Sequence, residues 1–119
     1  MNSINLVGRL TRDPELRETK GDTKVAGMRL AVPRRQRNGE DQAPVYIDVT
    51  AFGTLAENCG KYLQKGRRVA VAGRLEYSEW TDDNQGKHSK HEVIADQVDF
   101  LDAPANGTAP ADERDGESN

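Results

Sequence analysis

The chain has 119 residues, of which 34% are hydrophobic and 31% are charged, and its formal net charge is −3. This length fits one small domain plus a tail, and no apolar run approaches the ~20 residues that a membrane span needs. One cysteine excludes an internal disulfide, and the N-terminus lacks the apolar region of a signal peptide, so we expect a cytoplasmic protein.

Two strands are predicted before residue 33. Apolar residues alternate from Ile4 to Leu10, and Gly8 within this run suggests a bulge or a bend. The alternation returns from Lys24 to Val32, after a turn signal at residues 20–22. Pro33 ends this second run, because proline has no N–H to donate to a strand ladder.

A hairpin loop and a third strand follow. The loop covers residues 34–44 and has Asn38-Gly39 at its centre, a pair typical of tight hairpin turns. The strand VYIDVTAF then has a core face and a polar face, because side chains alternate along a strand. The core face is predicted to hold Val45, Ile47, Val49 and Ala51, and the polar face Tyr46, Asp48, Thr50 and Phe52.

One short helix is predicted next. Thr54 and Glu57 have the spacing of a capping box, so Thr54 is expected to be the N-cap of the helix. Gly66 is the expected stop residue. The apolar residues at helical spacing are Leu55, Cys59, Tyr62 and Leu63.

Two more strands complete the domain. The first ends near Trp80, with Arg74 and Trp80 on its polar face and with Val69, Val71, Leu75 and Tyr77 on its core face. Residues 82–87 form a hairpin tip. The last strand covers residues 91–101, and its irregular phase around Asp96 predicts a bulge.

The sequence divides into a domain, residues 1–102, and an acidic tail, residues 103–119, which lacks large apolar residues and is expected to be disordered. Five of the 20 acidic residues and one of the 17 basic residues lie from residue 102 onward, so the body is near neutral. Such a body binds phosphates if its arginines share one face; a scattered, solvated surface is the alternative. The order of three strands, one helix and two strands is that of the OB-fold, an all-β five-stranded Greek-key barrel.

The residues argue against an enzyme, a metal site and a cofactor. His88, His91 and Cys59 do not supply the four ligands of a zinc site. The sequence has no nucleophile-elbow or phosphate-loop motif, and its acidic residues are scattered singly.

Binding of nucleic acid is the better prediction. Three aromatic residues are expected on polar strand faces, namely Tyr46, Phe52 and Trp80, and rings with interleaved cations form the surface that grips single strands. A hydrophobic plug remains the alternative for Tyr46 and Phe52, and packing remains the alternative for Trp80. Phosphate contacts are expected from arginines, since a guanidinium pairs with phosphate as a fork. The candidates are Arg9, Arg12, Arg29, Arg34, Arg35, Arg37, Arg67, Arg68 and Arg74, although Arg67 and Arg68 also fit a solvated strand start.

The chain resembles bacterial single-stranded DNA-binding proteins over about residues 1–102. Five segments carry the resemblance in order: INLVGRLTRDPELR, RLAVPRR, FGTLAENCGKYLQKG, VAVAGRLEYSEWTD and EVIADQVDFL. The resemblance implies an OB-fold, non-catalytic and largely sequence-independent binding of single-stranded DNA, and assembly as a homotetramer. It implies roles in replication, recombination and repair, a cytoplasmic, nucleoid-associated location, and base stacking on Tyr46, Phe52 and Trp80.

Two departures from the family pattern stand out. An aromatic residue often present in the loop after the second strand is replaced by Gln36, which predicts less stacking and more phosphate contact there. The chain ends in DERDGESN without the hydrophobic tip that recruits partner proteins, which argues against tail-mediated partners. A housekeeping protein, a paralogue for DNA uptake and a mobile-element copy all remain open. So do two other functions: an OB-fold module that binds a replication protein and touches DNA weakly, and an OB-fold nuclease.

Overall fold

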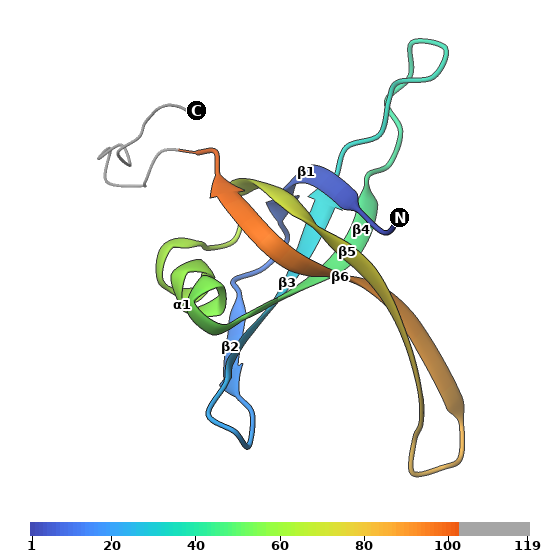
Figure 1. Cartoon of the computed structure of the whole chain (residues 1–119). Coiled ribbons are helices and arrows are strands. Elements are labelled where there is room, and N and C mark those ends of the chain that lie inside the picture. Colours follow the sequence, from blue (N-terminus) through green and yellow to red (C-terminus); the bar gives the residue numbers. More distant parts are fainter. Residues whose placement is uncertain (103–119) are drawn as a thin grey trace.

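The computed structural model describes residues 1–102, and the predicted tail, residues 103–119, lies outside the described residues. Six strands and one helix make up the described part (Figure 1). They are β1 (Ile4–Leu10), β2 (Glu15–Glu18), β3 (Lys24–Val32), β4 (Val45–Phe52), α1 (Gly53–Tyr62), β5 (Arg68–Thr81) and β6 (Lys87–Phe100).

All six strands belong to one sheet, which curls back on itself. The order is β1-β5-β6-β4-β3-β2, and β1 also pairs with β3 through Arg9↔Ala31 and Leu10↔Leu30. Five strands thus surround the core, with α1 between β4 and β5 at one side (Figure 1). This arrangement confirms the predicted OB-fold.

The sixth strand, β2, was not predicted. It pairs antiparallel with the first half of β3, from Glu15↔Gly27 to Glu18↔Lys24, across a turn in which Asp22 has a φ of 61°. All four of its residues are exposed, and Leu16 is the one apolar residue among them. An edge strand of this kind buries neither face, so it has no apolar alternation for sequence reasoning to detect.

Gly8 marks a close approach of backbones, and of the two predicted alternatives the bulge does not occur there. The register of β1 with β5 runs unbroken from Ile4↔Gly73 to Arg9↔Arg68. A Cβ atom added at Gly8 would lie 2.6 Å from the carbonyl oxygen of Ala31. Glycine is therefore needed where β1 passes from β5 to β3 and the sheet curls closed.

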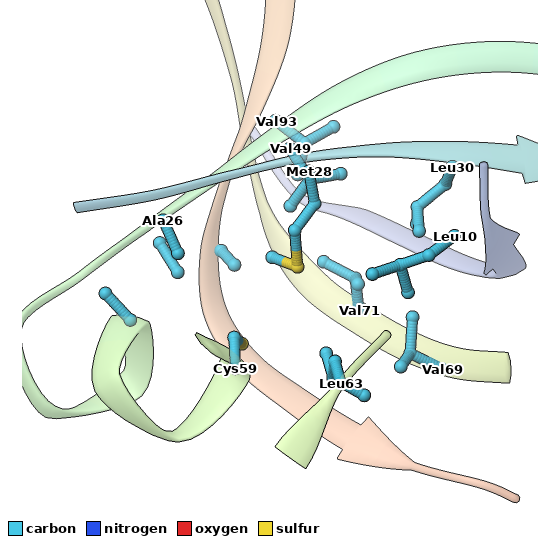
Figure 2. Close-up of a cluster of buried hydrophobic side chains, with 13 residues drawn as sticks. Leu10, Ala26, Met28, Leu30, Val49, Cys59, Leu63, Val69, Val71 and Val93 are labelled. Carbon is cyan, nitrogen blue, oxygen red and sulfur yellow. The ribbon is translucent and has the colours of Figure 1, made fainter. Parts of the chain in front are cut away.

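The core is formed by the inward faces of the strands and by one side of α1 (Figure 2). Met28, Leu30 and Val49 are its central side chains from β3 and β4, and each is almost fully buried. The predicted alternation is confirmed in the middle of both strands, since Gly27, Arg29 and Thr50 on their other faces are only partly buried. Val45 was predicted to be a core residue, but it is 48% exposed because it lies at the outer end of β4, and Val25 on the other face of β3 is buried.

The ends of α1 differ from the prediction. Gly53 has a φ of 66°, and the helix begins there with Phe52 as its N-cap and no side-chain cap hydrogen bond. The capping box at Thr54 was therefore wrong, because the N-cap lies two residues earlier. The helix ends at Tyr62, and Gly66, with a φ of 91°, serves the following turn, where its N–H donates to the Leu10 carbonyl.

β1 pairs with β5 up to Gly73 and β4 pairs with β6 up to Glu92, and beyond these pairings β5 and β6 continue as a long two-stranded hairpin (Figure 1). Leu75 and Tyr77 were predicted to be core residues, but 40% and 52% of their surface is exposed. They lie on the hairpin face that continues the core, but beyond the part of that face over which the rest of the sheet packs. The predicted bulge at Asp96 is confirmed, because the register passes from Ala72↔Gln97 to Gly73↔Ala95 and skips it.

Candidate nucleic-acid interface

The outward side of β3 and β4 carries the first two predicted rings. Tyr46 and Phe52 are 51% and 46% exposed, so neither is the hydrophobic plug that remained as the alternative. Tyr46 pairs with a small residue of β3, Ala31. The Arg29 guanidinium carbon lies 5.5 Å from the centre of the Tyr46 ring, within the range of a cation–π contact.

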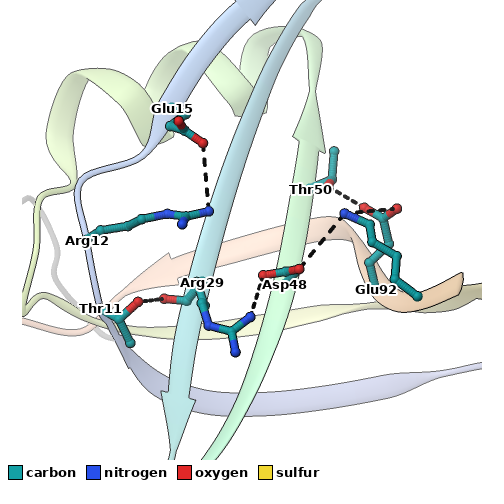
Figure 3. A network of polar contacts seen from close by, with 8 residues as sticks. Thr11, Arg12, Glu15, Arg29, Asp48, Thr50 and Glu92 are labelled. Carbon is teal, nitrogen blue, oxygen red and sulfur yellow. Dashed lines mark hydrogen bonds and ion pairs between the residues drawn. The ribbon is translucent and has the colours of Figure 1, made fainter. Parts of the chain in front are cut away.

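Four charged side chains, Arg29, Asp48, Lys90 and Glu92, form what we call the acid–base cluster on this side (Figure 3). Arg29 Nη1 donates to Asp48 Oδ1 at 3.0 Å. Lys90 Nζ lies 3.9 Å from Asp48 Oδ2 and 4.0 Å from Glu92 Oε2. Thr50 Oγ1 donates to Glu92, and the parallel pairing of β4 with β6 brings the two carboxylates together.

A groove of about 270 Å³ lies beside the acid–base cluster. Its lining includes Arg12 and Arg17 from the chain around β2, together with Asp48, Thr50 and Lys90. Arg12 Nη2 lies 3.7 Å from Glu15, so this guanidinium is also paired. The unpredicted strand β2 thus forms one wall of the groove and brings two more cations to it.

Trp80 projects from the β5–β6 hairpin and is 47% exposed. Its indole stacks on the ring of His88, with centroids 5.5 Å apart and an interplanar angle of 19°. His88 Nε2 lies 2.7 Å from Asp82 Oδ2. This hydrogen bond, with those from the N–H groups of Gly86 and Asn84, lowers the pKa of the Asp82 carboxyl.

The hairpin connects Trp80 to the acid–base cluster. Its register pairs Trp80 with His88 and Ser78 with Lys90, so Lys90 lies on the same hairpin face as the indole. Lys90 also reaches Asp48 on β4. A continuous polar surface therefore leads from Trp80 to Arg29 and Tyr46. Phe52 lies farther along β4, six residues from Tyr46, or about 20 Å at ~3.3 Å per residue.

The predicted arginines do not form a single track. Arg9 pairs with Asp102 at 3.2 Å and is the register partner of Arg68, whose N–H donates to the same carboxylate. Arg67 adjoins this pair in sequence. Arg74 lies 3.4 Å from Glu76 and 3.6 Å from Asp96.

The loop between β3 and β4 supplies a separate group of cations. Arg34, Arg35 and Arg37 are exposed on it, and within residues 1–102 their side chains have no ion pair. The loop turns at Asn38 and Gly39, with φ values of 55° and 78°, as predicted for a tight hairpin. Gln36, which stands in this loop, donates to Asp41 at 2.6 Å.

Lys90, Asp48 and Glu92 were missed as candidate site residues. The last strand was predicted to begin at His91, whereas β6 begins at Lys87, so the face shared by Lys90 and Trp80 went unnoticed. Among residues 1–102 no group of His, Cys, Asp or Glu side chains could hold a metal ion. Burial raises the pKa of the Cys59 thiol to about 11, which keeps it protonated near neutral pH.

Comparison with known proteins extends these observations. Residues 1–101 match the family model described as "Single-strand binding protein family". A "Single-stranded DNA-binding protein" of Caldanaerobacter subterraneus subsp. tengcongensis is 36% identical over 119 residues, which is 97% of this chain and 79% of that protein. The protein of the same name from Wolinella succinogenes is 38% identical over 86% of this chain, and the chain spans 65% of its length.

A solved structure is also similar. It is described as "Plasmodium falciparum SSB complex with ssDNA", and it matches with a TM-score of 0.76 at 29% identity. The match covers 86% of this chain and 96% of that one. Within residues 1–102 of the present chain, no helix has the length and apolar character needed to cross a membrane.

Proposed function

The chain belongs to the single-strand binding protein family, and on that premise we propose that it binds and protects single-stranded DNA with little regard to sequence. The observation that carries this proposal is the continuous surface from Trp80 through Lys90 to Tyr46. On it, the half-exposed rings of Trp80 and Tyr46 lie on either side of the cations Lys90 and Arg29.

Two interactions account for the binding. Cations contact the phosphates, and the contact is independent of base identity because every nucleotide carries the same phosphate. Bases then stack on Tyr46, Phe52 and Trp80, and each stacked base contributes about 1–3 kcal/mol. Stacking tolerates any sequence, since every base has a flat π-face.

The phosphate contacts fall into two groups by location. Arg12, Arg29 and Arg74 lie near the rings of β4 and the hairpin, and Arg34, Arg35 and Arg37 extend from the β3–β4 loop. Arg9, Arg67 and Arg68 lie near Asp102, at the end of β1 and the start of β5. A strand of DNA that contacts all three rings passes the first group, and we assign the second group to a flanking stretch of the same strand.

The wider role follows from family membership. We propose that residues 1–102 are the DNA-binding domain, that the protein acts in replication, recombination and repair in the cytoplasm at the nucleoid, and that it assembles as a homotetramer. Binding without catalysis is proposed, as the names of the relatives describe DNA binding.

The direct test uses the single tryptophan. Titration with oligo-dT is expected to quench Trp80 fluorescence, and binding is expected to weaken with salt by a slope of about −0.7 per neutralised phosphate. Light scattering on the same samples measures the assembly state. Unchanged emission together with an unchanged electrophoretic mobility of the labelled oligonucleotide would refute the proposed function.

A further inference from the structure

The acid–base cluster is electrically neutral at the centre of the proposed DNA-binding surface. Its two cations, Arg29 and Lys90, face two carboxylates, Asp48 and Glu92, at distances of 3.0 to 4.0 Å. A surface selected only for phosphate affinity gains nothing from carboxylates at this place, because they repel the DNA backbone. Their position therefore calls for a physical explanation.

A structural role explains the carboxylates only in part. The side chains of Asp48 and Arg29 are 31% and 42% exposed, and ion pairs with such exposure contribute about 0.2–1 kcal/mol or less to folding. Both residues lie on the outward face of paired strands, whose backbone hydrogen bonds and buried inner faces already fix the sheet. Stability is thus a weak reason for keeping an acid here.

The carboxylates and DNA phosphates compete for the same donors. The Arg29 guanidinium can pair with a carboxylate or with a phosphate, since both present two oxygens to its fork. Asp48 holds that guanidinium and is 3.9 Å from Lys90, so it contacts both cations of the acid–base cluster. Asp48 and Lys90 both line the adjacent groove, so a phosphate that enters it competes with Asp48 for Lys90.

We propose that Asp48 and Glu92 are built-in competitors of the DNA phosphates, which hold Arg29 and Lys90 in the free protein and thereby lower both the affinity and the salt dependence of binding. This inference rests on the proposed function. Its consequence is faster release of the strand, because each phosphate contact at the acid–base cluster has a neighbouring carboxylate ready to replace it. The rings have no carboxylate competitor, although Trp80 stacks on His88 and Tyr46 lies near Arg29, and base stacking then supplies most of the binding free energy at this surface.

The test compares Asp48→Asn with Asp99→Asn. Both changes remove one carboxylate charge, but Asp99 lies on β6 seven residues beyond Glu92, about 23 Å away at ~3.3 Å per residue. That distance exceeds the ~10 Å screening length at 0.1 M salt. Asp99 contacts only the Gln97 amide among the described side chains, so its removal disturbs no cation.

Asp48→Asn is expected to tighten oligo-dT binding roughly two- to fivefold at low salt, the range that one exposed ion pair allows. The salt slope should steepen by about 0.7, as for one additional neutralised phosphate. Glu92→Gln should act in the same direction. Asp99→Asn should change the affinity less than Asp48→Asn and leave the slope unchanged.

A double-mutant cycle separates competition from a general charge effect. Arg29→Gln should weaken binding more in the Asp48→Asn background than in the wild-type protein, because only the freed guanidinium contacts phosphate fully. Equal losses in both backgrounds, or weaker binding by folded Asp48→Asn, would overturn the inference and leave Asp48 as a residue that positions Arg29. If wild-type protein fails to bind oligo-dT, the proposed function itself is wrong; if it binds and Asp48→Asn does not bind tighter, only this inference is wrong.

Discussion

Replacement of Trp80 by alanine tests the stacking surface most directly, because the hairpin supplies a matched control on its other face. Trp80 and Tyr77 are exposed to similar extents, 47% and 52%, and each packs against a cross-strand histidine, His88 or His91. Their parity along β5 places them on opposite sides of the hairpin. The two variants therefore remove comparable amounts of aromatic surface from the same element.

The expected losses of DNA affinity differ, because only the hairpin face that carries Trp80 continues into the acid–base cluster. Trp80→Ala should cost about 1–3 kcal/mol of binding, or roughly 5- to 160-fold in Kd, since it removes one stacking platform. Tyr77→Ala should change Kd less than twofold. Each variant also loses a cross-strand pair of about 0.2–1 kcal/mol, so their effects on folding stability should be similar.

The assay is fluorescence polarisation of a dye-labelled oligo-dT, because the alanine variant has lost the intrinsic tryptophan signal. Trp80→Phe serves as the rescue, since a phenylalanine ring keeps a smaller platform at the same position. Urea unfolding of each variant serves as the control for whether the hairpin change has altered the stability of the barrel. Equal losses of affinity for Trp80→Ala and Tyr77→Ala would refute the assignment of one hairpin face to DNA, and so would a loss below twofold for both.

Three further predictions concern folding and titration. Gly8→Ala should destabilise the protein by about 1–3 kcal/mol in urea unfolding, because the added Cβ meets the Ala31 carbonyl, whereas Gly27→Ala, where nothing lies within 4 Å, should not cause such a loss. The lowered pKa of Asp82 favours the folded hairpin above the ordinary pKa of an aspartate. That contribution is lost as pH falls through the lowered value, so Trp80 fluorescence should show an acidic transition that Asp82→Asn removes. The raised pKa of the buried Cys59 thiol predicts slow reaction with a thiol reagent at pH 8 in the native protein and rapid reaction in denaturant.

Alternation predicted the faces of the strands well but not how far the barrel covers them. Tyr46 and Phe52 were assigned to the outward side of β4, and they lie there. The same reasoning assigned Leu75 and Tyr77 to the core, and both are exposed. Alternation reports which residues share a face, whereas burial also requires a second layer opposite that face, and the hairpin extends past the last strand that could supply one.

Local motifs were less reliable where tertiary contacts decide the backbone. The capping box at Thr54 and Glu57 has the correct spacing, but the chain enters the helix two residues earlier, with Phe52 as the N-cap and a positive φ at Gly53. Gly8 was recognised as exceptional, yet the reason is the Ala31 backbone, which comes from a strand more than 20 positions away. The contact between Gly8 and Ala31 has no signature within a short window of sequence.

The charges of the interface were the least predictable part, because an arginine's availability depends on its neighbours in space. Nine arginines were proposed from their positions on faces and in loops, and the structure pairs Arg9, Arg12, Arg29 and Arg74 with carboxylates. Asp48 and Glu15 come from other strands and Asp102 from the chain after β6, whereas Glu76 lies on the same strand as Arg74. A count of basic residues therefore overstates the positive potential that DNA meets.

This pairing explains how a near-neutral body can still serve as a single-strand binder. An exposed ion pair contributes at most about 1 kcal/mol, so a phosphate that displaces a carboxylate from a cation gains only the difference between two similar contacts. Stacking has no comparable competitor in the free protein, apart from the His88 ring against Trp80 and the Arg29 guanidinium near Tyr46. A stacked base contributes about 1–3 kcal/mol, which is more than such an exchange can. The rings should therefore determine affinity, while the paired cations guide the backbone and allow the strand to leave.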